Sequence, residues 1–351
     1  MSRAIRWLLR GIKSRLGGLV HRDRPADSGP ATAVVATPVE AAPATAIALA
    51  RQAWSERGHR LLEDILAGRR RLVGHPALEP AVSVILVLHN KAALSALAID
   101  SLIRHLDAPH ELIVVDNASS DETAALLGAI EGLRVLRFEQ NLGFGPACNL
   151  AAQQARGEFL LFFNNDALLQ PGALGAALAV FDEEPAVGAV GGKIVLSDGS
   201  LQELGAFVWE DGVTAGYGRG EDPQSPGYSR RLAADYASGV FLLTPRALFD
   251  SVGGFDARYA PAYYEDVDYC VELWTRGYAV LVEAMAVVRH YESATSLEAA
   301  VPLSAVNRIK FCDKWATWLA GRSACSHETM ADRVAQAQGR WNEVRRTHES
   351  R

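Results

Sequence analysis

The sequence has little cysteine, no long apolar run and no excess of positive charge. Its four cysteines lie far apart without C-x-x-C spacing, which argues against a zinc site or a disulfide framework and favours a reducing compartment. No apolar run reaches the roughly 18–20 residues that span a bilayer. The net charge of −6 over 351 residues argues against nucleic-acid binding. We therefore expect a cytoplasmic protein without a nucleic-acid partner.

Two nucleotide-binding patterns are also missing. No predicted strand is followed by G-x-G-x-x-G or by G-x-x-x-x-G-K-[ST], so a dinucleotide-binding enzyme and a phosphate-loop enzyme are both weakly supported. What the chain does have is the composition of a globular protein, 49% hydrophobic and 22% charged.

The first 79 residues differ from those that follow. Residues 1–24 carry seven basic side chains and apolar residues at helical spacing. They predict a basic amphipathic helix suited to peripheral contact with the inner face of the cytoplasmic membrane, although a poorly ordered basic tail remains an alternative. Residues 25–43 form a Pro- and Ala-rich linker, and residues 44–79 predict one or two helices leading into the main domain.

The most informative stretch runs from Phe159 to Asp166. Five large apolar residues predict a strand buried on both faces, and the strand stops at Asn164, Asn165 and Asp166. Ligands of open α/β sheets bind at the carboxyl ends of such strands, and Asp166 with Asn164 offers oxygen ligands for a divalent cation. The same three residues also favour an ordinary turn, which is the alternative interpretation.

Before this stretch, strands alternate with helices. We predict strands at 82–88, 112–115 and 134–138, helices at 92–105 and 122–130, and a third helix through Asn149. This alternation with short loops predicts a parallel sheet flanked by helices. Each strand ends in polar or glycine residues, so the four strand ends should form one cleft.

A second acidic stretch lies about one hundred residues later. Glu265, Asp266 and Asp268 open a helix that is predicted to run to about Arg276. Two short strands are predicted at 280–282 and 286–288, and the second ends at Arg289 and His290. Acidic residues are favoured in a first helical turn, which is one explanation for them. Crowded carboxylates also raise each other's pKa, which suits a general base. A histidine at a strand end near carboxylates suits a metal ligand.

Six blocks in order carry a family resemblance. They are Val84–Asn90, Val114–Ser119, Asn141–Gly145, Phe162–Asp166, Val252–Asp256 and Tyr264–Asp268, followed by Arg289 and His290. Residues from about 81 to 296 resemble a family 2 glycosyltransferase with the GT-A fold, of the bacterial rhamnosyltransferase-like group. We place this domain at 80–298, with a Rossmann-like, mostly parallel central sheet flanked by helices, and a C-terminal helical extension at 299–351. In the extension, residues 307–311 are predicted to begin a helix that includes Trp315 and Trp318.

The resemblance implies roles for individual residues. Asp266 matches the catalytic base, with Glu265 as the second choice. Asp166, Asn164 and His290 match the positions that hold Mg²⁺ or Mn²⁺, although an amide replaces the first acid of the family's D-x-D motif. The acceptor would contact Ser238 and Gly239. The residues implied for the nucleotide-sugar donor are Leu88, His89, Asn90, Asp116, Asn117, Asn141, Gly143, Asn149 and Asn165.

One departure affects the donor pocket, because Val87–Asn90 replaces the family's usual Pro-Thr-Tyr-Asn. The expected function is an inverting, metal-dependent transferase of the hexosyltransferase type. It would move a sugar from a UDP- or dTDP-sugar to a glycan or lipid-linked glycan in cell-surface polysaccharide biosynthesis. Two alternatives stay open: a non-catalytic glycan- or nucleotide-binding protein, and a nucleotidyltransferase. Residues 197–238 predict a loop, either a mobile lid or a plain surface insertion.

Overall fold

The computed structural model describes residues 43–184, 186–292, 297–322 and 329–349. From Pro43 onward the chain forms one compact unit. The predicted amphipathic segment at 1–24 and nearly all of the linker lie outside the described residues.

Helices and strands alternate along most of the described chain. The helices are α2 (Pro43–Leu66), α3 (Ala92–His105), α4 (Thr123–Gly128), α5 (Phe144–Ala152), α6 (Ala173–Glu183), α7 (Arg246–Val252), α8 (Glu265–Thr275), α9 (Leu297–Lys314), α10 (Ala316–Leu319) and α11 (Met330–Glu349), with short 3₁₀ helices η2 (Pro226–Tyr228) and η3 (Ala257–Tyr259). The strands are β1 (Val82–Leu88), β2 (His110–Asn117), β3 (Arg134–Phe138), β4 (Phe159–Asn164), β5 (Ala167–Leu169), β6 (Val187–Leu196), β7 (Leu201–Leu204), β8 (Ala206–Val208), β9 (Thr214–Gly216), β10 (Leu232–Ala233), β11 (Phe241–Pro245) and β12 (Ala279–His290).

The four strands predicted first form one half of the main sheet. They lie in the order β4-β1-β2-β3 and all neighbouring pairs are parallel, as predicted. The register pairs Leu88 with Asp116 and Val87 with Asn164, so the polar ends of these strands share one edge. The expected α/β class is confirmed.

The other half of the sheet is mixed. Strand β11 is antiparallel to both β4 and β6, whereas β12 is parallel to β6. Because β11 runs opposite to β4, its first residue, Phe241, pairs with Phe163 near the end of β4. At the end of β12, His290 pairs with Ala167 of β5. Both connections bring later parts of the chain to the edge where β4 ends.

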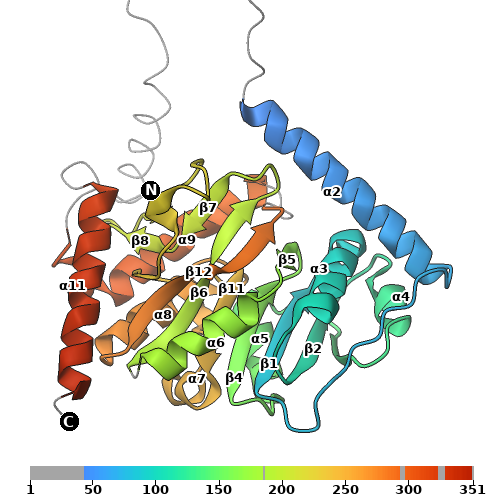
Figure 1. Cartoon of the computed structure of the whole chain (residues 1–351), viewed down its shortest axis with the longest axis horizontal. Helices are drawn as coiled ribbons and strands as arrows, with labels where there is room; N and C mark the ends of the chain where they lie inside the picture. Colours follow the sequence, from blue (N-terminus) through green and yellow to red (C-terminus); the bar gives the residue numbers. More distant parts are fainter. Residues whose placement is uncertain (1–42, 185, 293–296, 323–328, 350–351) are drawn as a thin grey trace, which may run out of the picture. The chain divides into compact units, whose positions relative to one another are not determined.

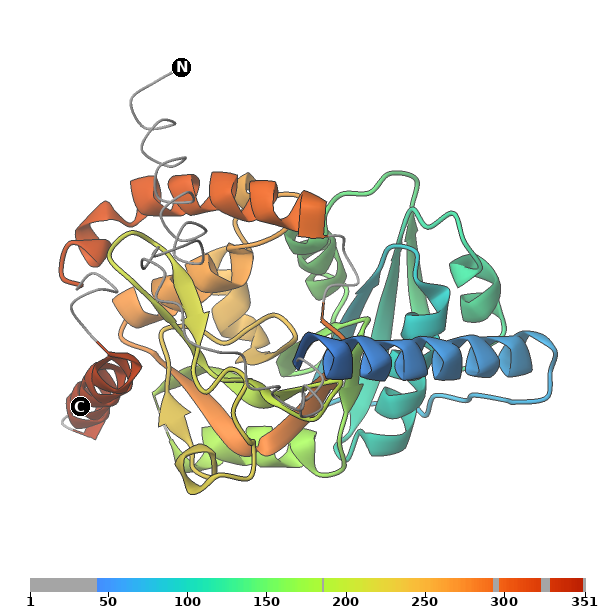
Figure 2. The ribbon, with the colours of Figure 1, turned by 90° about the horizontal axis from the view of Figure 1, so that it is seen from above.

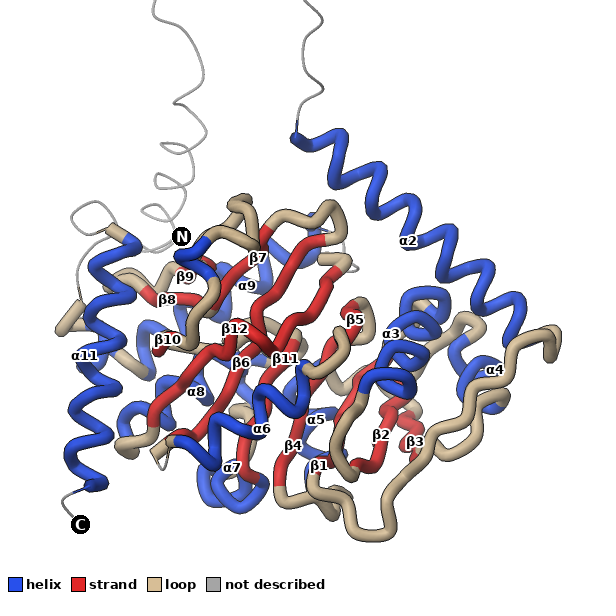
Figure 3. Tube along the Cα trace, in the orientation of Figure 1, coloured by secondary structure: helices blue, strands red, loops and turns tan. Residues whose placement is uncertain are grey.

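Helices cover both faces of the sheet, which explains the continuous apolar runs in β1 and β4. Helices α3 and α6 lie on one face, and α5, α7 and α8 lie on the other (Figures 1 and 2). Phe162 and Phe163 of β4, which point to opposite faces, are both fully buried. Helix α2 packs on α3, while α11 lies against β8 and β10 at the far side of the unit (Figure 3).

Three expectations outside the parallel half were wrong. The two short strands expected around 280–288 are one strand, β12, with an irregularity between Glu283 and Val287. The segment 197–238 is not simply a loop, because it forms β7 to β10 and has many buried residues. The C-terminal helix expected to include Trp315 and Trp318 ends at Lys314, and α10 begins after Trp315.

Two expectations about membranes and cysteines can be compared with the described residues. Within those ranges, we find no helix long and apolar enough to cross a membrane. The described cysteines, Cys148, Cys270 and Cys312, are free thiols.

Candidate active site

A cleft of about 490 Å³ opens at the edge where β4 ends and where the connection before β11 and the end of β12 arrive. Several predicted site residues from distant parts of the sequence line it together. They are Asn164, Asn165, Asp166, Ser238, Gly239, Glu265, Asp266 and His290. The fold therefore gathers the predicted metal-binding, acceptor and base positions in one cavity.

Asp166 and His290 meet across 124 positions of the chain. His290 Nε2 lies 3.0 Å from Asp166 Oδ1, and both side chains are buried. The backbone holds the pair in place, because the N–H of Tyr291 donates to the carbonyl of Asp166 at 2.9 Å. Burial lowers the pKa of His290, but the charge and hydrogen bond of Asp166 outweigh burial, so the pKa is raised above its ordinary value of 6.5.

The other ring nitrogen of His290 shows how this pair suits a cation. Nδ1 lies 2.8 Å from Gln202 Oε1, and an amide oxygen only accepts, so Nδ1 carries a proton. In a neutral imidazole Nε2 then offers a lone pair toward the carboxylate of Asp166. A lone pair and a carboxylate at this distance can share a proton or a metal ion, and an oriented histidine with a carboxylate is a usual donor set for divalent cations. The residues present therefore fit a divalent metal.

The donor set is small. Within the described ranges, no group of three or more His, Cys, Asp or Glu side chains gathers as a metal cluster. Asn164, at the end of β4, lines the same cleft and brings an amide oxygen to it, together with the candidate ligands Asp166 and His290.

The two acidic residues at the start of α8 have different surroundings. Asp266 Oδ2 accepts the backbone N–H of Gly239 at 2.9 Å, and Oδ1 accepts that of Val267 at 2.8 Å. Glu265 Oε2 is buried without a hydrogen-bond partner. Burial raises the pKa of both carboxyls, and the nearby Asp266 raises that of Glu265 further. Three backbone N–H groups, those of Gly239, Val267 and Asp266 itself, lower the pKa of Asp266, whereas for Glu265 only its own N–H does so, and Asp266 is therefore the carboxyl that ionises more readily.

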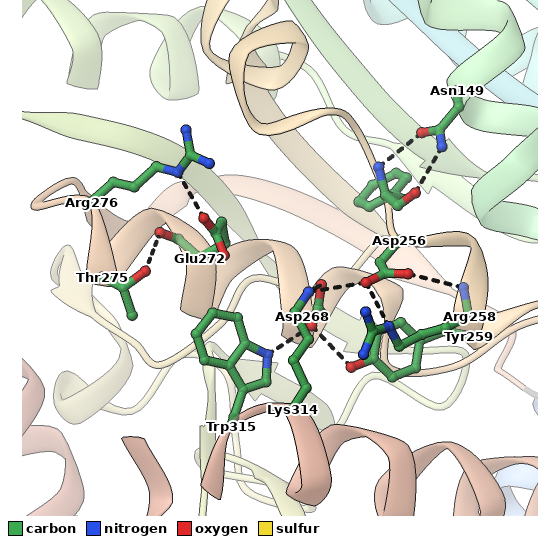
Figure 4. A network of polar contacts seen from close by, with 11 residues as sticks. Asn149, Asp256, Arg258, Tyr259, Asp268, Glu272, Thr275, Arg276, Lys314 and Trp315 are labelled. Atoms are coloured by element: carbon green, nitrogen blue, oxygen red, sulfur yellow. Dashed lines mark hydrogen bonds and ion pairs between the residues drawn. The ribbon is translucent and has the colours of Figure 1, made fainter. Parts of the chain in front are cut away.

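The third acidic residue, Asp268, is structural. It points away from the cleft and accepts hydrogen bonds from Tyr259 (2.9 Å), Lys314 (2.8 Å) and Trp315 (2.7 Å), as Figure 4 shows. Lys314 also reaches Asp256 at 3.1 Å, which ties α9 to the turn before α8. Two of the acidic residues in the first turn of α8 therefore line the cleft, and the third joins α8 to α9. Their spacing in the sequence does not show which residue does which.

Seven of the nine residues predicted to hold the nucleotide-sugar lie at or just after the ends of β1, β2 and β3, outside the lining of the cleft, whereas Asn165 lines the cleft and Asn149 lies in α5. His89 Nδ1 lies 2.9 Å from the carbonyl of Asn117. The side-chain amide of Asn117 donates to Asn141 Oδ1 at 2.9 Å, and Asn141 Oδ1 also accepts the N–H of Gly143. These bonds shape the loop from Asn141 to Gly143, so its backbone can border a ligand.

Other residues predicted to bind the nucleotide-sugar already have hydrogen-bond partners within the protein or are buried in its core. Asp116 Oδ1 accepts the backbone N–H of Ser119, and Asn90 Oδ1 accepts that of Ser120. Leu88 is fully buried in the core. Both polar atoms of the Asn149 side chain are bonded to the backbone of Phe255. The amide nitrogen donates to the carbonyl of Phe255, and the amide oxygen accepts the N–H of the same residue (Figure 4).

Comparison with known proteins identifies a family that part of this chain matches. Residues 83–211 match the model of glycosyl transferase family 2. This chain carries a family 2 glycosyltransferase domain. The O-antigen biosynthesis protein RfbC of Myxococcus xanthus is 32% identical over 234 residues, which cover 64% of this chain and 18% of that protein. The N-acetylglucosaminyl-diphospho-decaprenol L-rhamnosyltransferase of Mycobacterium tuberculosis is 29% identical over 246 residues, covering 62% of this chain and 80% of that protein.

A solved structure gives the fold independently. The mannosyltransferase PcManGT from Pyrobaculum calidifontis, in complex with GDP-Man and Mn²⁺, matches 86% of this chain and 83% of its own with a TM-score of 0.51 at 18% identity. The fold is GT-A, as expected. The chain spans only 18% to 25% of the length of two curated relatives that it matches.

Five of the eight predicted residues that line the cleft lie outside the matched region. Ser238, Gly239, Glu265, Asp266 and His290 all follow residue 211, the last matched position. The cleft is completed by the segment 197–238 and by α9, the helix after β12.

Several lining residues were missed in the sequence. They are Gln202, Glu203, Tyr263 and Ser304. Burial, and then the nearby charge of Asp266, raise the pKa of Glu203 to about 7. The only sequence signal for Gln202 and Glu203 was their place in 197–238, and nothing in the local pattern marked Ser304.

Proposed function

We propose that this chain is an inverting, metal-dependent glycosyltransferase that moves a sugar from a nucleotide-sugar to a hydroxyl of a glycan or lipid-linked glycan in cell-surface polysaccharide biosynthesis. One observation carries the proposal. The pair Asp166–His290 and the carboxylate of Asp266 line the same cleft of a family 2 glycosyltransferase domain, although they come from distant parts of the chain.

In this proposal Asp166 and His290 would hold Mg²⁺ or Mn²⁺, with the amide oxygen of Asn164 as a third donor. When bound, the cation would neutralise negative charge that develops on the diphosphate leaving group. Gln202 fixes the ring of His290 through Nδ1 and so keeps Nε2 facing Asp166, where it would be available as a ligand. The mannosyltransferase PcManGT, solved with GDP-Man and Mn²⁺, supports a divalent cation beside a nucleotide-sugar in this fold.

Asp266 is the proposed general base. The acceptor hydroxyl loses its proton to Asp266 Oδ2 or Oδ1 as its oxygen attacks the anomeric carbon, and the bond from that carbon to the diphosphate oxygen breaks. The raised pKa of Asp266 makes its carboxylate a stronger acceptor of the hydroxyl proton. The N–H groups of Gly239 and Val267 favour its ionised form. One base and one displacement without a covalent intermediate invert the anomeric configuration.

The donor nucleotide is proposed to lie along the ends of β1 to β3. The backbone from Asn141 to Gly143 and the side chain of Asp116 border that edge. The similarity to a rhamnosyltransferase from M. tuberculosis favours a dTDP-sugar or UDP-sugar donor and a lipid-linked acceptor. Contact of residues 1–24 with a membrane surface remains a sequence-based proposal, as do the boundaries of the domain at 80–298 and its extension.

The acceptor is proposed to occupy the part of the cleft between Ser238, Gly239 and the start of α8. Tyr236 and Tyr263 add aromatic surface there, and Ser304 adds a hydroxyl from α9. Aromatic faces and hydroxyl groups are suited to sugar rings, which present both C–H surface and hydrogen-bonding groups.

The test uses purified full-length protein with dTDP-rhamnose and UDP-glucose as donors, Mn²⁺, and prenyl-diphosphate-linked N-acetylglucosamine as acceptor. Nucleoside diphosphate release measures turnover, and nuclear magnetic resonance gives the anomeric configuration of the product. Transfer with inversion that needs Asp266 supports the proposal. Product with retained configuration, or full turnover by Asp266→Asn, contradicts the assigned mechanism.

A further inference from the structure

Helix α9 packs one stripe of side chains onto the segment that leads into α8. Asn307, Phe311 and Lys314 recur at i, i+4 and i+7, so they share one face of the helix. Asn307 and Phe311 are almost fully buried, and the ring of Phe311 lies 5.4 Å from that of Tyr264. Lys314 donates to Asp268 at 2.8 Å. The stripe therefore contacts the chain on both sides of the two cleft carboxylates.

Asn307 is the most specific of these contacts. Its side-chain nitrogen lies 2.6 Å from the carbonyl oxygen of Tyr259, 2.9 Å from that of Ala262 and 3.0 Å from that of Tyr263. Backbone carbonyls only accept hydrogen bonds, so the amide must present its N–H groups to them. The two hydrogens of one buried amide therefore satisfy three carbonyls within five residues, and no other side chain in the described contacts serves them together.

The segment held by Asn307 has an unusual backbone. Tyr263 and Tyr264 both have φ of 76°, a left-handed conformation that side chains with a Cβ rarely adopt. Such backbone persists only where surrounding contacts fix it. Besides Asn307, the N–H of Phe144 donates to the carbonyl of Pro261 at 2.7 Å, and the hydroxyl of Tyr264 donates to Gly212 at 2.8 Å. The path of the chain into α8 is thus fixed from three sides.

This path decides where the two carboxylates lie. Glu265 and Asp266 follow the left-handed tyrosines directly, and α8 starts at Glu265. A turn of the backbone at Tyr263 would move the Asp266 carboxylate away from the Gly239 N–H and out of line with the cleft. We infer that Asn307 is a positioning residue for the catalytic base, acting through the carbonyls of Tyr259, Ala262 and Tyr263. The inference rests on the proposed role of Asp266.

The test compares Asn307→Leu, which keeps the size of the side chain but has no N–H, with Lys310→Ala. Lys310 lies on the same helix, is more exposed and donates to the carbonyl of Arg258, just outside the held segment. Turnover is measured well below the melting temperature of each variant. We expect a kcat at least tenfold lower for Asn307→Leu with a donor KM within twofold of wild type, and no change for Lys310→Ala. Wild-type kcat in folded Asn307→Leu, or an equal loss in Lys310→Ala, overturns the inference.

A second measurement needs no substrate. Hydrogen–deuterium exchange of peptides covering residues 259–268 should speed up in Asn307→Leu and stay unchanged in Lys310→Ala, while exchange in β1 and β2 stays unchanged in both. Equal exchange in that segment for wild type and Asn307→Leu overturns the inference. If the wild-type protein turns over no donor at all while this difference is seen, the proposed function fails and the positioning of the segment by Asn307 stands.

Discussion

The backbone N–H of Gly239 donates to Asp266 Oδ2 at 2.9 Å, joining the turn before β11 to the first turn of α8. This bond stabilises the ionised form of Asp266, whereas Glu265 Oε2 beside it is buried without a hydrogen-bond partner. It therefore favours ionisation of Asp266 over ionisation of Glu265.

The first prediction follows from that difference. Asp266→Asn should lower kcat by about 10²- to 10⁴-fold, the usual contribution of a general base, without changing nucleotide affinity. Glu265→Gln should lower kcat much less, because a protonated carboxyl and an amide are similar in shape and in the hydrogen bonds they can form. Steady-state turnover and nucleotide titration of both variants check this. A larger loss in Glu265→Gln than in Asp266→Asn would exchange the two roles.

The second prediction concerns Gln202, which faces His290 Nδ1 at 2.8 Å. Gln202→Leu should weaken metal affinity about 10- to 100-fold, because the ring loses the partner that orients Nε2. The Mn²⁺ concentration giving half-maximal turnover measures the effect. Gln224→Leu, an exposed glutamine of the same segment, is the control and should behave as wild type. An unchanged Mn²⁺ requirement in Gln202→Leu would count against the assigned ligand.

The third prediction is a pH dependence of stability. Burial raises the folded-state pKa of Glu265 well above 4.5, so the folded protein keeps a proton that the unfolded chain has lost. Its contribution to stability is complete below the unfolded pKa and is lost as pH rises toward the folded pKa, by up to about 1.4 kcal/mol per pH unit. Urea unfolding at pH 5 and pH 8 should show a smaller drop for Glu265→Gln than for wild type. An equal drop would mean that Glu265 is ionised at both pH values.

The fourth prediction concerns the anchor of the C-terminal helix. Asp235 is fully buried and pairs with Arg322, Arg333 and Arg340, which join α11 and the chain after α10 to the connection before β11. Asp235→Asn leaves buried guanidinium groups without their carboxylate, so the free energy of unfolding should fall by about 3–5 kcal/mol.

Urea unfolding measures this loss, and Glu272→Gln is the matched control. Glu272 pairs with Arg276 at 2.8 Å on the surface of α8 (Figure 4), so its loss should cost less than about 1 kcal/mol. If Asp235→Asn also lowers the free energy of unfolding by less than about 1 kcal/mol, the three arginines do not need the carboxylate for stability.

The parallel half of the fold could be predicted because its signals are local. Continuous apolar runs such as β1 and β4 end in polar residues, and the bounds of β1, α3 and β3 follow from the sequence alone. The mixed half could not, because the pairing of β11 with β4 and β6 is a tertiary choice. The segment 197–238 looks like a loop by composition, and its short strands form only against β6, β12 and each other.

The site divides in the same way. Asp166 and Asp266 carry motif signals, but the roles of Asp268, Asn149 and Asn307 depend on contacts that no spacing reveals. Asp268 shares a first helical turn with Asp266 and still faces Lys314 instead of the cleft. Asn307 stands in an ordinary helical pattern, and only the fold brings it to three carbonyls of another segment.

The most direct test of the central claim is a thermal-shift measurement with UDP, dTDP, GDP and CDP, each with and without Mn²⁺, on wild type and His290→Ala. A ligand that binds only the folded state raises the melting temperature, and about 2.7 kcal/mol is expected at one hundred times Kd. The account predicts a shift with one nucleotide that requires Mn²⁺ and disappears in His290→Ala. No shift with any nucleotide in folded protein, or one that is the same without Mn²⁺, would contradict a metal-dependent nucleotide-sugar site.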